Sequence, residues 1–391
     1  MIRISLRRRT LQCAALLACA TLAVAAHAQP TGPIKVGLML PTSGTFADLG
    51  KKVASGFKLY VTENGGKLAG RLVQYVELDD ESDPSKANEN ANKLVKRDRV
   101  DVLIGTIHSG VAMTMARVAR DTNTLMIVPN AGAAEITGSM CAPNVFRTSF
   151  SNWQPGYATG LLAARKHKTA VTISWKYAAG DESVRGFREG FEKGGGKVIK
   201  DLHLPFPNVE FQPLLTELAT IKPEAAYVFV AGAGQVKFVK DYAAAGLKNS
   251  IPLYGAFITE GTLEAQGEAA SGLQTALHYA DGLKIPKNEA FITSYQKTYN
   301  AAPDVFAVQG YDAAQLFAAG LQAVKGDTRK KAEMIKAMED AKLESPRGPL
   351  SFSKSRNPIQ DMYARVATGN RNVMTDVIVK ALADPSPDCK L

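Results

Sequence analysis

Short apolar segments that alternate with helical patterns dominate the first part of this 391-residue chain. The segments between the expected strands have apolar residues at helical spacing, as in Phe57, Tyr60 and Val61. Strands that alternate with helices form a parallel sheet covered by helices. The strands are expected at Ile34–Leu40, Leu72–Leu78, Val102–Ile104 and Leu125–Val128.

The same alternation then starts again, which indicates a second unit of similar size. Its strands are expected at Ala170–Ser174, Lys197–Leu202, Ala225–Val230 and Pro252–Tyr254. Its helices are expected at Glu182–Lys193, Phe211–Ile221 and Gln235–Ala245. Two consecutive α/β units predict a protein of two lobes.

The last part of the chain differs from both units. Helices are expected first, over Asn288–Tyr299, Phe306–Val324 and Arg329–Glu339. Strands at Tyr363–Thr368 and Val373–Ala381 follow, joined by a turn at Gly369-Asn370. If these elements complete the two earlier lobes, the chain crosses between the lobes several times.

The N-terminus has the pattern of a secretory signal peptide. Four arginines precede an apolar run from Leu11 to Ala26, and Ala26-His27-Ala28 forms a small-residue cleavage site. Cleavage is expected after Ala28, which implies a periplasmic protein. A membrane anchor is the alternative, but the run is short for a span of roughly 20 residues. A lipoprotein signal at Cys19 is a further alternative, although the apolar run continues past this cysteine.

The positive charge of the chain comes partly from this segment. Residues 1–28 contain four basic residues and no acidic one, so their removal lowers the net charge from +10 to +6. The remaining basic residues are scattered and form no basic tract with interleaved aromatic residues. The sequence therefore argues against a nucleic-acid-binding protein.

Two cysteines, Cys141 and Cys389, remain after the signal peptide is removed. In an oxidising compartment such a pair favours one disulfide, which would hold the C-terminal tail to the loop after Thr137. Two unpaired thiols are the alternative, because the sequence does not give the distance between them.

Small polar residues gather in the loops that follow the strands of the first unit. Ligands of open α/β sheets bind beyond the carboxyl ends of the strands. Hydroxyl groups, free backbone N–H groups and a helix N-terminus in these loops suit a carboxylate, and an aromatic side chain suits an apolar ligand body. The candidate ligand-binding residues in these loops are Ser43, Phe46, His108, Ser109, Asn130, Ala131 and Gly132.

Signatures of catalysis and of cofactor binding are weak. The pair Gly232 and Gly234 follows an expected strand, but Lys237 stands where a dinucleotide fingerprint has its third glycine. Gly234 is therefore retained only as a candidate ligand contact. The mature histidines lack metal-ligand spacing, and the acidic stretch Asp79–Asp83 is better explained by Asp83 capping a helix that begins at Pro84. We expect no cofactor, no metal and no enzymatic activity.

From Ile34 to its end the chain resembles the leucine/isoleucine/valine-binding protein family, the type I periplasmic binding proteins of ABC importers. The motifs that carry the resemblance are Ile34-Lys35-Val36-Gly37, Pro41-Thr42-Ser43-Gly44, Asp79-Asp80 to Asp83-Pro84, Val102-Leu103-Ile104-Gly105, Pro129-Asn130-Ala131, Phe146-Arg147-Thr148 and Gln309-Gly310-Tyr311-Asp312-Ala313.

The resemblance implies an α/β fold of two Rossmann-like lobes that close on a ligand between them by hinge motion. Three crossover segments are expected near Phe150, Tyr279 and Phe352. Lobe 1 is then expected to comprise residues 29–149 and 280–352, and lobe 2 residues 150–279 and 353–391. The expected partners are a small carboxylate ligand and an inner-membrane permease, with the chain itself a monomer.

The resemblance also bears on the ligand. In amino-acid-binding members a second-lobe glutamate completes the ammonium site, and Glu260 matches it, while Tyr177 roughly matches a pocket tyrosine. Gly132, however, replaces a threonine hydroxyl, and Asn130 replaces an alanine. The Pro-Asn-Ala-Gly loop is similar to that of relatives that bind aromatic carboxylates.

We therefore expect a benzoate or phenylpropenoate as ligand. A branched-chain amino acid is the first alternative, and Glu260 is the residue that speaks for it. A ligand-sensing receptor module and an exported enzyme are the others.

Overall fold

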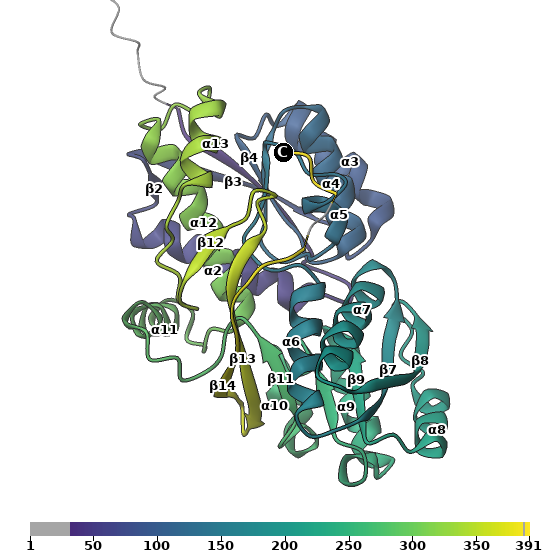
Figure 1. The fold of residues 1–391 in the computed structure, drawn as a ribbon. Coiled ribbons are helices and arrows are strands. Elements are labelled where there is room, and N and C mark those ends of the chain that lie inside the picture. The colour runs from purple at the N-terminus through teal and green to yellow at the C-terminus, as the bar shows by residue number, and fades with distance from the viewer. Residues whose placement is uncertain (1–31, 386–387) are drawn as a thin grey trace, which may run out of the picture.

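The computed structural model describes residues 32–385 and 388–391, so the expected signal peptide lies outside the described residues. Two sheets, each flanked by helices, lie one above the other in Figure 1. Within the described ranges, no helix is both long and apolar enough to span a membrane. This mixed α/β architecture of two sheet-based lobes confirms the expected fold class.

The first sheet has six strands in the order β2-β3-β1-β4-β5-β6. All its pairings are parallel except that of β2 with β3. Its strands are β1 (Ile34–Leu40), β2 (Lys67–Leu68), β3 (Arg71–Asp79), β4 (Val102–Ile104), β5 (Leu125–Val128) and β6 (Val145–Arg147). Its helices are α2 (Ala47–Glu63), α3 (Pro84–Asn92), which a π-helix continues over Lys93–Arg97, α4 (Ser109–Asp121), α5 (Ala134–Thr137), α12 (Val305–Ala323) and α13 (Lys331–Glu339).

The second sheet has the order β12-β13-β11-β10-β9-β7-β8, with β14 paired to β13. Its strands are β7 (Thr169–Lys176), β8 (Lys197–Pro205), β9 (Ala225–Phe229), β10 (Leu253–Gly255), β11 (Gln274–Leu277), β12 (Leu350–Phe352), β13 (Pro358–Thr368) and β14 (Arg371–Leu382). Its helices are α6 (Trp153–Ala164), α7 (Ala178–Lys193), α8 (Gln212–Ile221), α9 (Ala233–Ala244) and α10 (Leu263–Gln266), and α11 (Pro286–Tyr299) follows.

The sequence pattern predicted most of the strands and missed four of those in the described part of the chain. Strands β4 and β5 have the expected bounds, and Asp83 caps α3 by accepting a hydrogen bond from the backbone N–H of Ser85 at 2.8 Å. Strands β2, β6, β11 and β12 were not expected, and each has two to four residues.

The segment expected as the third crossover, near Phe352, contacts both sheets. Strand β12 ends at this residue and pairs with β13 of the second sheet. The Phe352 ring packs against Phe146 of β6 in the first sheet, with ring centroids 6.3 Å apart. The lobe boundaries stay a prediction.

A buried arginine ties the crossovers together. The guanidinium group of Arg347 forms an ion pair with Asp312 of α12, with its Nε 3.0 Å from the carboxylate. It also donates to the carbonyl oxygen of Ser149, in the first crossover, at 3.1 Å. Both side chains of the ion pair are almost fully buried, so loss of either one would leave an uncompensated charge. The crossovers are thus held by polar bonds between distant parts of the sequence.

The C-terminal tail returns to the first sheet's side of the molecule. Cys389 is joined to Cys141 by a disulfide, with the two Cα atoms 5.6 Å apart. Figure 1 shows the C-terminus near α4 and α5, in the upper part of the view, whereas the turn that joins β13 and β14 lies in the lower part. The tail therefore connects the second sheet back to the loop that follows α5.

Candidate functional site

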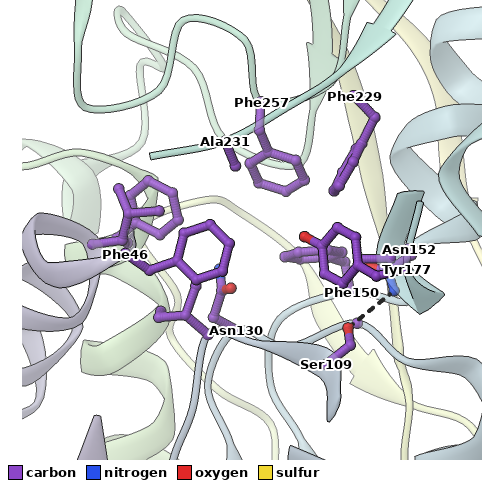
Figure 2. A pocket seen from close by; sticks show the side chains of 14 residues that line it. Phe46, Ser109, Asn130, Phe150, Asn152, Tyr177, Phe229, Ala231 and Phe257 are labelled. Atoms are coloured by element: carbon purple, nitrogen blue, oxygen red, sulfur yellow. Dashed lines mark hydrogen bonds between the residues drawn. The ribbon is translucent and has the colours of Figure 1, made fainter. Parts of the chain in front are cut away.

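A cavity lies where loops from both sheets meet. Figure 2 shows the side chains around it, with phenyl rings on one side and amide and hydroxyl groups toward the other. The residues that line it are Phe46, Leu49, Ile107, Ser109, Asn130, Gly132, Phe150, Asn152, Tyr177, Ala179, Phe229, Ala231, Phe257 and Phe306. Five of the ten expected ligand-binding residues are among them, namely Phe46, Ser109, Asn130, Gly132 and Tyr177.

The first sheet's loops supply two polar side chains of the lining, Ser109 and Asn130. Ser109 is the first residue of α4, so its hydroxyl lies at the positive end of the helix dipole. Its Oγ accepts a weak hydrogen bond from the Asn152 amide at 3.4 Å (Figure 2). Asn130, after β5, donates to the Gln309 side chain at 2.7 Å. These groups can donate hydrogen bonds to an anion without a cationic side chain.

Gly132 is required by the close approach of Asn152. A Cβ atom at Gly132 would lie 2.4 Å from Oδ1 and 2.7 Å from the backbone nitrogen of Asn152. The carbonyl oxygen of Gly132 accepts from that backbone N–H at 2.8 Å. The Asn152 amide therefore occupies the space that a side chain at position 132 would need.

His108 supports the cavity from behind and is not among its lining residues. Its Nδ1 accepts from the backbone N–H groups of Gly110 at 3.0 Å and Val111 at 3.4 Å, which caps α4. Its ring packs against Phe46, Tyr177 and Phe206. Burial lowers the pKa of His108 to about 4, so the ring is neutral near pH 7. His108 thus caps the helix that carries Ser109, and its expected role in holding a carboxylate stays a prediction.

The second sheet's loops supply an almost wholly apolar wall. Phe229 and Ala231 come from the end of β9, and Phe257 follows β10. Phe257 packs on Phe150 of the first crossover with ring centroids 4.8 Å apart. Figure 2 shows the hydroxyl group of Tyr177 directed toward the middle of the cavity, and it is the one polar side-chain group on this wall.

Glu260 lies outside the lining and is paired with an arginine of this chain. Its carboxylate is 2.6 Å from the guanidinium group of Arg365, and both side chains are almost fully buried. Asn372 donates a further hydrogen bond to the same carboxylate at 3.1 Å. Burial raises the pKa of Glu260 to about 7, and the charge of Arg365 opposes this shift. The carboxylate oxygens of Glu260 therefore already bind groups of the protein itself, namely Arg365 and Asn372.

Three other expected site residues also lie outside the lining. The Ser43 hydroxyl donates to Asp79 at 2.6 Å and is exposed. Ala131 donates its backbone N–H to the carbonyl oxygen of Thr106 at 2.9 Å. Gly234 packs against the Trp175 ring, where a Cβ atom would lie 2.4 Å from the nearest ring atom.

Asn152 and most of the aromatic residues of the lining were not expected from the sequence. Phe229 and Phe257 do stand at the ends of expected strands, so a search for aromatic residues at these positions would have found them. Phe150, Asn152 and Phe306 carry no such signal, because a crossover and a distant helix bring them to the cavity.

Comparisons with known proteins agree with this architecture. A family described as periplasmic binding protein matches residues 33–371. The Leu/Ile/Val-binding protein homolog 6 of Brucella melitensis is 32% identical over 362 residues, which cover 90% of this chain and 92% of that protein.

Solved structures of ABC transporter solute-binding proteins also match. One from R. palustris, in complex with benzoate, has a TM-score of 0.90 and 50% sequence identity and covers 92% of this chain and 100% of that chain. Another, from Rhodopseudomonas palustris BisB5 in complex with 3,4-dihydroxybenzoic acid, has a TM-score of 0.85 and 31% sequence identity. It covers 91% of this chain and 99% of that chain.

These similar proteins are binding proteins rather than enzymes, which confirms the expectation of a non-catalytic function. Their solutes are small molecules, and the transporters they serve include a membrane permease. The chain belongs to the periplasmic binding protein family and is a periplasmic solute-binding protein of an ABC transporter.

Proposed function

We propose that this protein binds an aromatic carboxylate, with benzoate as the reference ligand, in the cavity between the two sheets and delivers it to the permease. The observation that carries the proposal is the division of the cavity lining. Rings and small apolar side chains surround one end, and Ser109, Asn130 and Asn152 stand at the other.

The carboxylate would be held by neutral donors. No Asp, Glu, Lys, Arg or His lines this cavity. The Ser109 hydroxyl, the Asn152 amide and the N-terminus of α4 together offer hydrogen bonds to a negative charge. The ligand ring would pack against Phe46, Phe229 and Phe257, where aromatic contacts add to the free energy of burying apolar area.

An α-amino acid fits this site poorly. Its ammonium group needs a negatively charged acceptor, and the one acidic residue expected for this purpose, Glu260, is bound to Arg365. The lining offers the ammonium group only neutral acceptors. An ammonium buried without a charged partner has a high desolvation cost.

The comparisons support the same ligand class. The 50% identical R. palustris protein was solved with benzoate, and more distant R. palustris proteins with 3,4-dihydroxybenzoic acid and p-hydroxybenzoic acid. The name of the Brucella relative points instead to branched-chain amino acids, at 32% identity.

Export and assembly complete the proposal. Residues 1–28 act as a signal peptide cleaved after Ala28, and the mature protein works as a monomer of two lobes that close on the ligand. Mass spectrometry of the periplasmic protein tests the cleavage site, and light scattering tests the monomer.

The ligand class is tested by a thermal-shift screen of the mature protein against benzoate, hydroxybenzoates, cinnamate, leucine, isoleucine and valine. A ligand at about 100 times its dissociation constant stabilises the folded state by roughly 2.7 kcal/mol. We expect stabilisation by benzoate and not by the amino acids. Stabilisation by leucine, isoleucine or valine without any by the aromatic acids would overturn the proposal.

A further inference from the structure

A carboxyl group carried by the second sheet's unit reaches the binding loop of the first. Glu182 lies in α7, which follows β7, and its side chain is buried. Its two oxygens accept from the backbone N–H of Ala134 at 3.1 and 3.0 Å. One of them also accepts from the Asn152 amide at 2.9 Å. Ala134 begins α5, directly after the loop that contains Asn130 and Gly132.

The same peptide group is bound from its other end by a buried cation. The carbonyl oxygen of Ala133 belongs to the peptide whose N–H is that of Ala134, and it accepts from Nη1 of Arg147 at 2.7 Å. Arg147, at the end of β6, is fully buried. The peptide is therefore polarised between an arginine of the first sheet and a glutamate of the second unit, an arrangement that strengthens both hydrogen bonds.

We propose that Glu182 is a positioning residue that couples lobe closure to ligand capture, by binding the Ala133–Ala134 peptide across the lobes and orienting Asn152 toward Ser109. The proposal rests on the proposed function, because Ser109 and Asn152 line the ligand cavity. Separation of the lobes would draw Glu182 away from the binding loop and leave the Ala134 N–H without this acceptor.

The contact between Glu182 and the Ala134 N–H stabilises the closed state of the lobes. Its loss should therefore raise the dissociation rate of the ligand more than it lowers the association rate. Contacts that form only after the partners have met mainly alter the dissociation rate. The orientation of Asn152 links the contact to the ligand, since the Asn152 amide touches both Glu182 and the Ser109 hydroxyl.

The test compares Glu182→Gln and Glu182→Ala with the matched control Asp181→Asn. Glutamine keeps one acceptor oxygen but turns its NH2 group toward one of the two donors. Asp181 is the neighbouring residue of α7, and its carboxylate pairs on the surface with Lys176. Stopped-flow measurement with benzoate should show a dissociation rate roughly tenfold higher for both Glu182 variants, with association within about twofold of the original protein. Dissociation rates equal to that of Asp181→Asn would overturn the proposal.

A second measurement does not depend on the ligand. Hydrogen exchange in the peptide that contains Ala134 should be faster in Glu182→Ala than in Asp181→Asn, because this amide has lost its acceptor. Glu182→Gln should give an intermediate rate, because glutamine keeps one acceptor oxygen. If the unaltered protein fails to bind benzoate, the proposed function fails while this exchange still tests the contact. Equal exchange in all variants would show that Glu182 does not hold the binding loop.

Discussion

The two walls of the cavity differ in the kind of bond they offer. The wall built on the first sheet carries Ser109, Asn130 and Gly132 at the ends of strands and at a helix N-terminus. The wall built on the second sheet carries Phe229 and Phe257. The first sheet's unit thus supplies Ser109 and Asn130 together with apolar residues such as Phe46, whereas the second wall is apolar except for the Tyr177 hydroxyl group.

This difference suggests an order of events in binding. A polar wall can orient a carboxylate while the lobes are apart, because hydrogen bonds to a charge act in the presence of water. An apolar wall adds most when water is expelled, which happens on closure. The first wall would then select the functional group and the second would select the ring.

The sharpest way to break the polar wall is Gly132→Ala. The new Cβ atom would lie 2.4 Å from Oδ1 and 2.7 Å from the backbone nitrogen of Asn152, so one of the two segments must move. We expect benzoate binding to weaken by roughly 100-fold or more, about 2.7 kcal/mol, in isothermal titration calorimetry. Addition of Asn152→Ala should restore only a part, because the backbone nitrogen remains. Affinity within threefold of the original would show that this packing does not shape the site.

Removal of a ring tests the apolar wall. Phe257→Ala should weaken benzoate binding by roughly 30-fold, about 2 kcal/mol, because the ligand ring loses its apolar contact. Phe257→Leu keeps most of the side-chain volume and should weaken benzoate binding only a few-fold. Calorimetry on both variants gives the comparison, and an alanine variant that binds as tightly as the leucine variant would contradict it.

A comparison of two serine variants tests whether the carboxylate binds in this cavity. Ser109→Ala should weaken benzoate binding by roughly tenfold, since a hydrogen bond to a charged group contributes about 1.5 to 3 kcal/mol and water or Asn152 can replace part of it. Ser43→Ala is the matched control, because its hydroxyl bonds to Asp79 outside the cavity. We expect the control to bind within twofold of the original protein in the same titration. Equal losses for both serines would place the carboxylate elsewhere.

The smallest expected effect is a dependence of the protein's stability on pH through His108, which caps helix α4 behind the polar wall. The pKa of His108 is about 4 in the folded protein, below its ordinary value of 6.5. At a pH between these two values, His108 is protonated in the unfolded chain and neutral in the folded protein. The free energy of unfolding therefore decreases as the pH falls. From pH 7 to pH 5.5 the loss is about 1 kcal/mol.

His108→Asn keeps a side-chain oxygen that can cap α4 but does not titrate. The melting temperature of the original protein should therefore fall more between pH 7 and pH 5.5 than that of this variant. Differential scanning calorimetry at the two pH values measures the difference. An identical shift in both proteins would show that His108 is free to take up a proton in the folded state.

The repeating strand and helix pattern was enough to predict two α/β units and the full extents of β4 and β5. Two of the polar residues singled out after the strands, Ser109 and Asn130, lie around a common cavity, and their part in ligand binding stays a prediction. The predictions of the fold succeed because periodicity and strand ends are local properties of the chain, and parallel strands bring their carboxyl ends to one edge of a sheet.

The tertiary structure alone decided what the local pattern could not. It placed Phe150 and Asn152, from a crossover, in the cavity and paired Glu260 with Arg365. A residue like Glu260 has the right type and position for an ammonium site, yet its availability depends on a buried partner far along the chain. Burial and pairing are set by contacts between segments far apart in the sequence, such as β13 and the loop after β10, and the residue spacing within one segment does not encode those contacts.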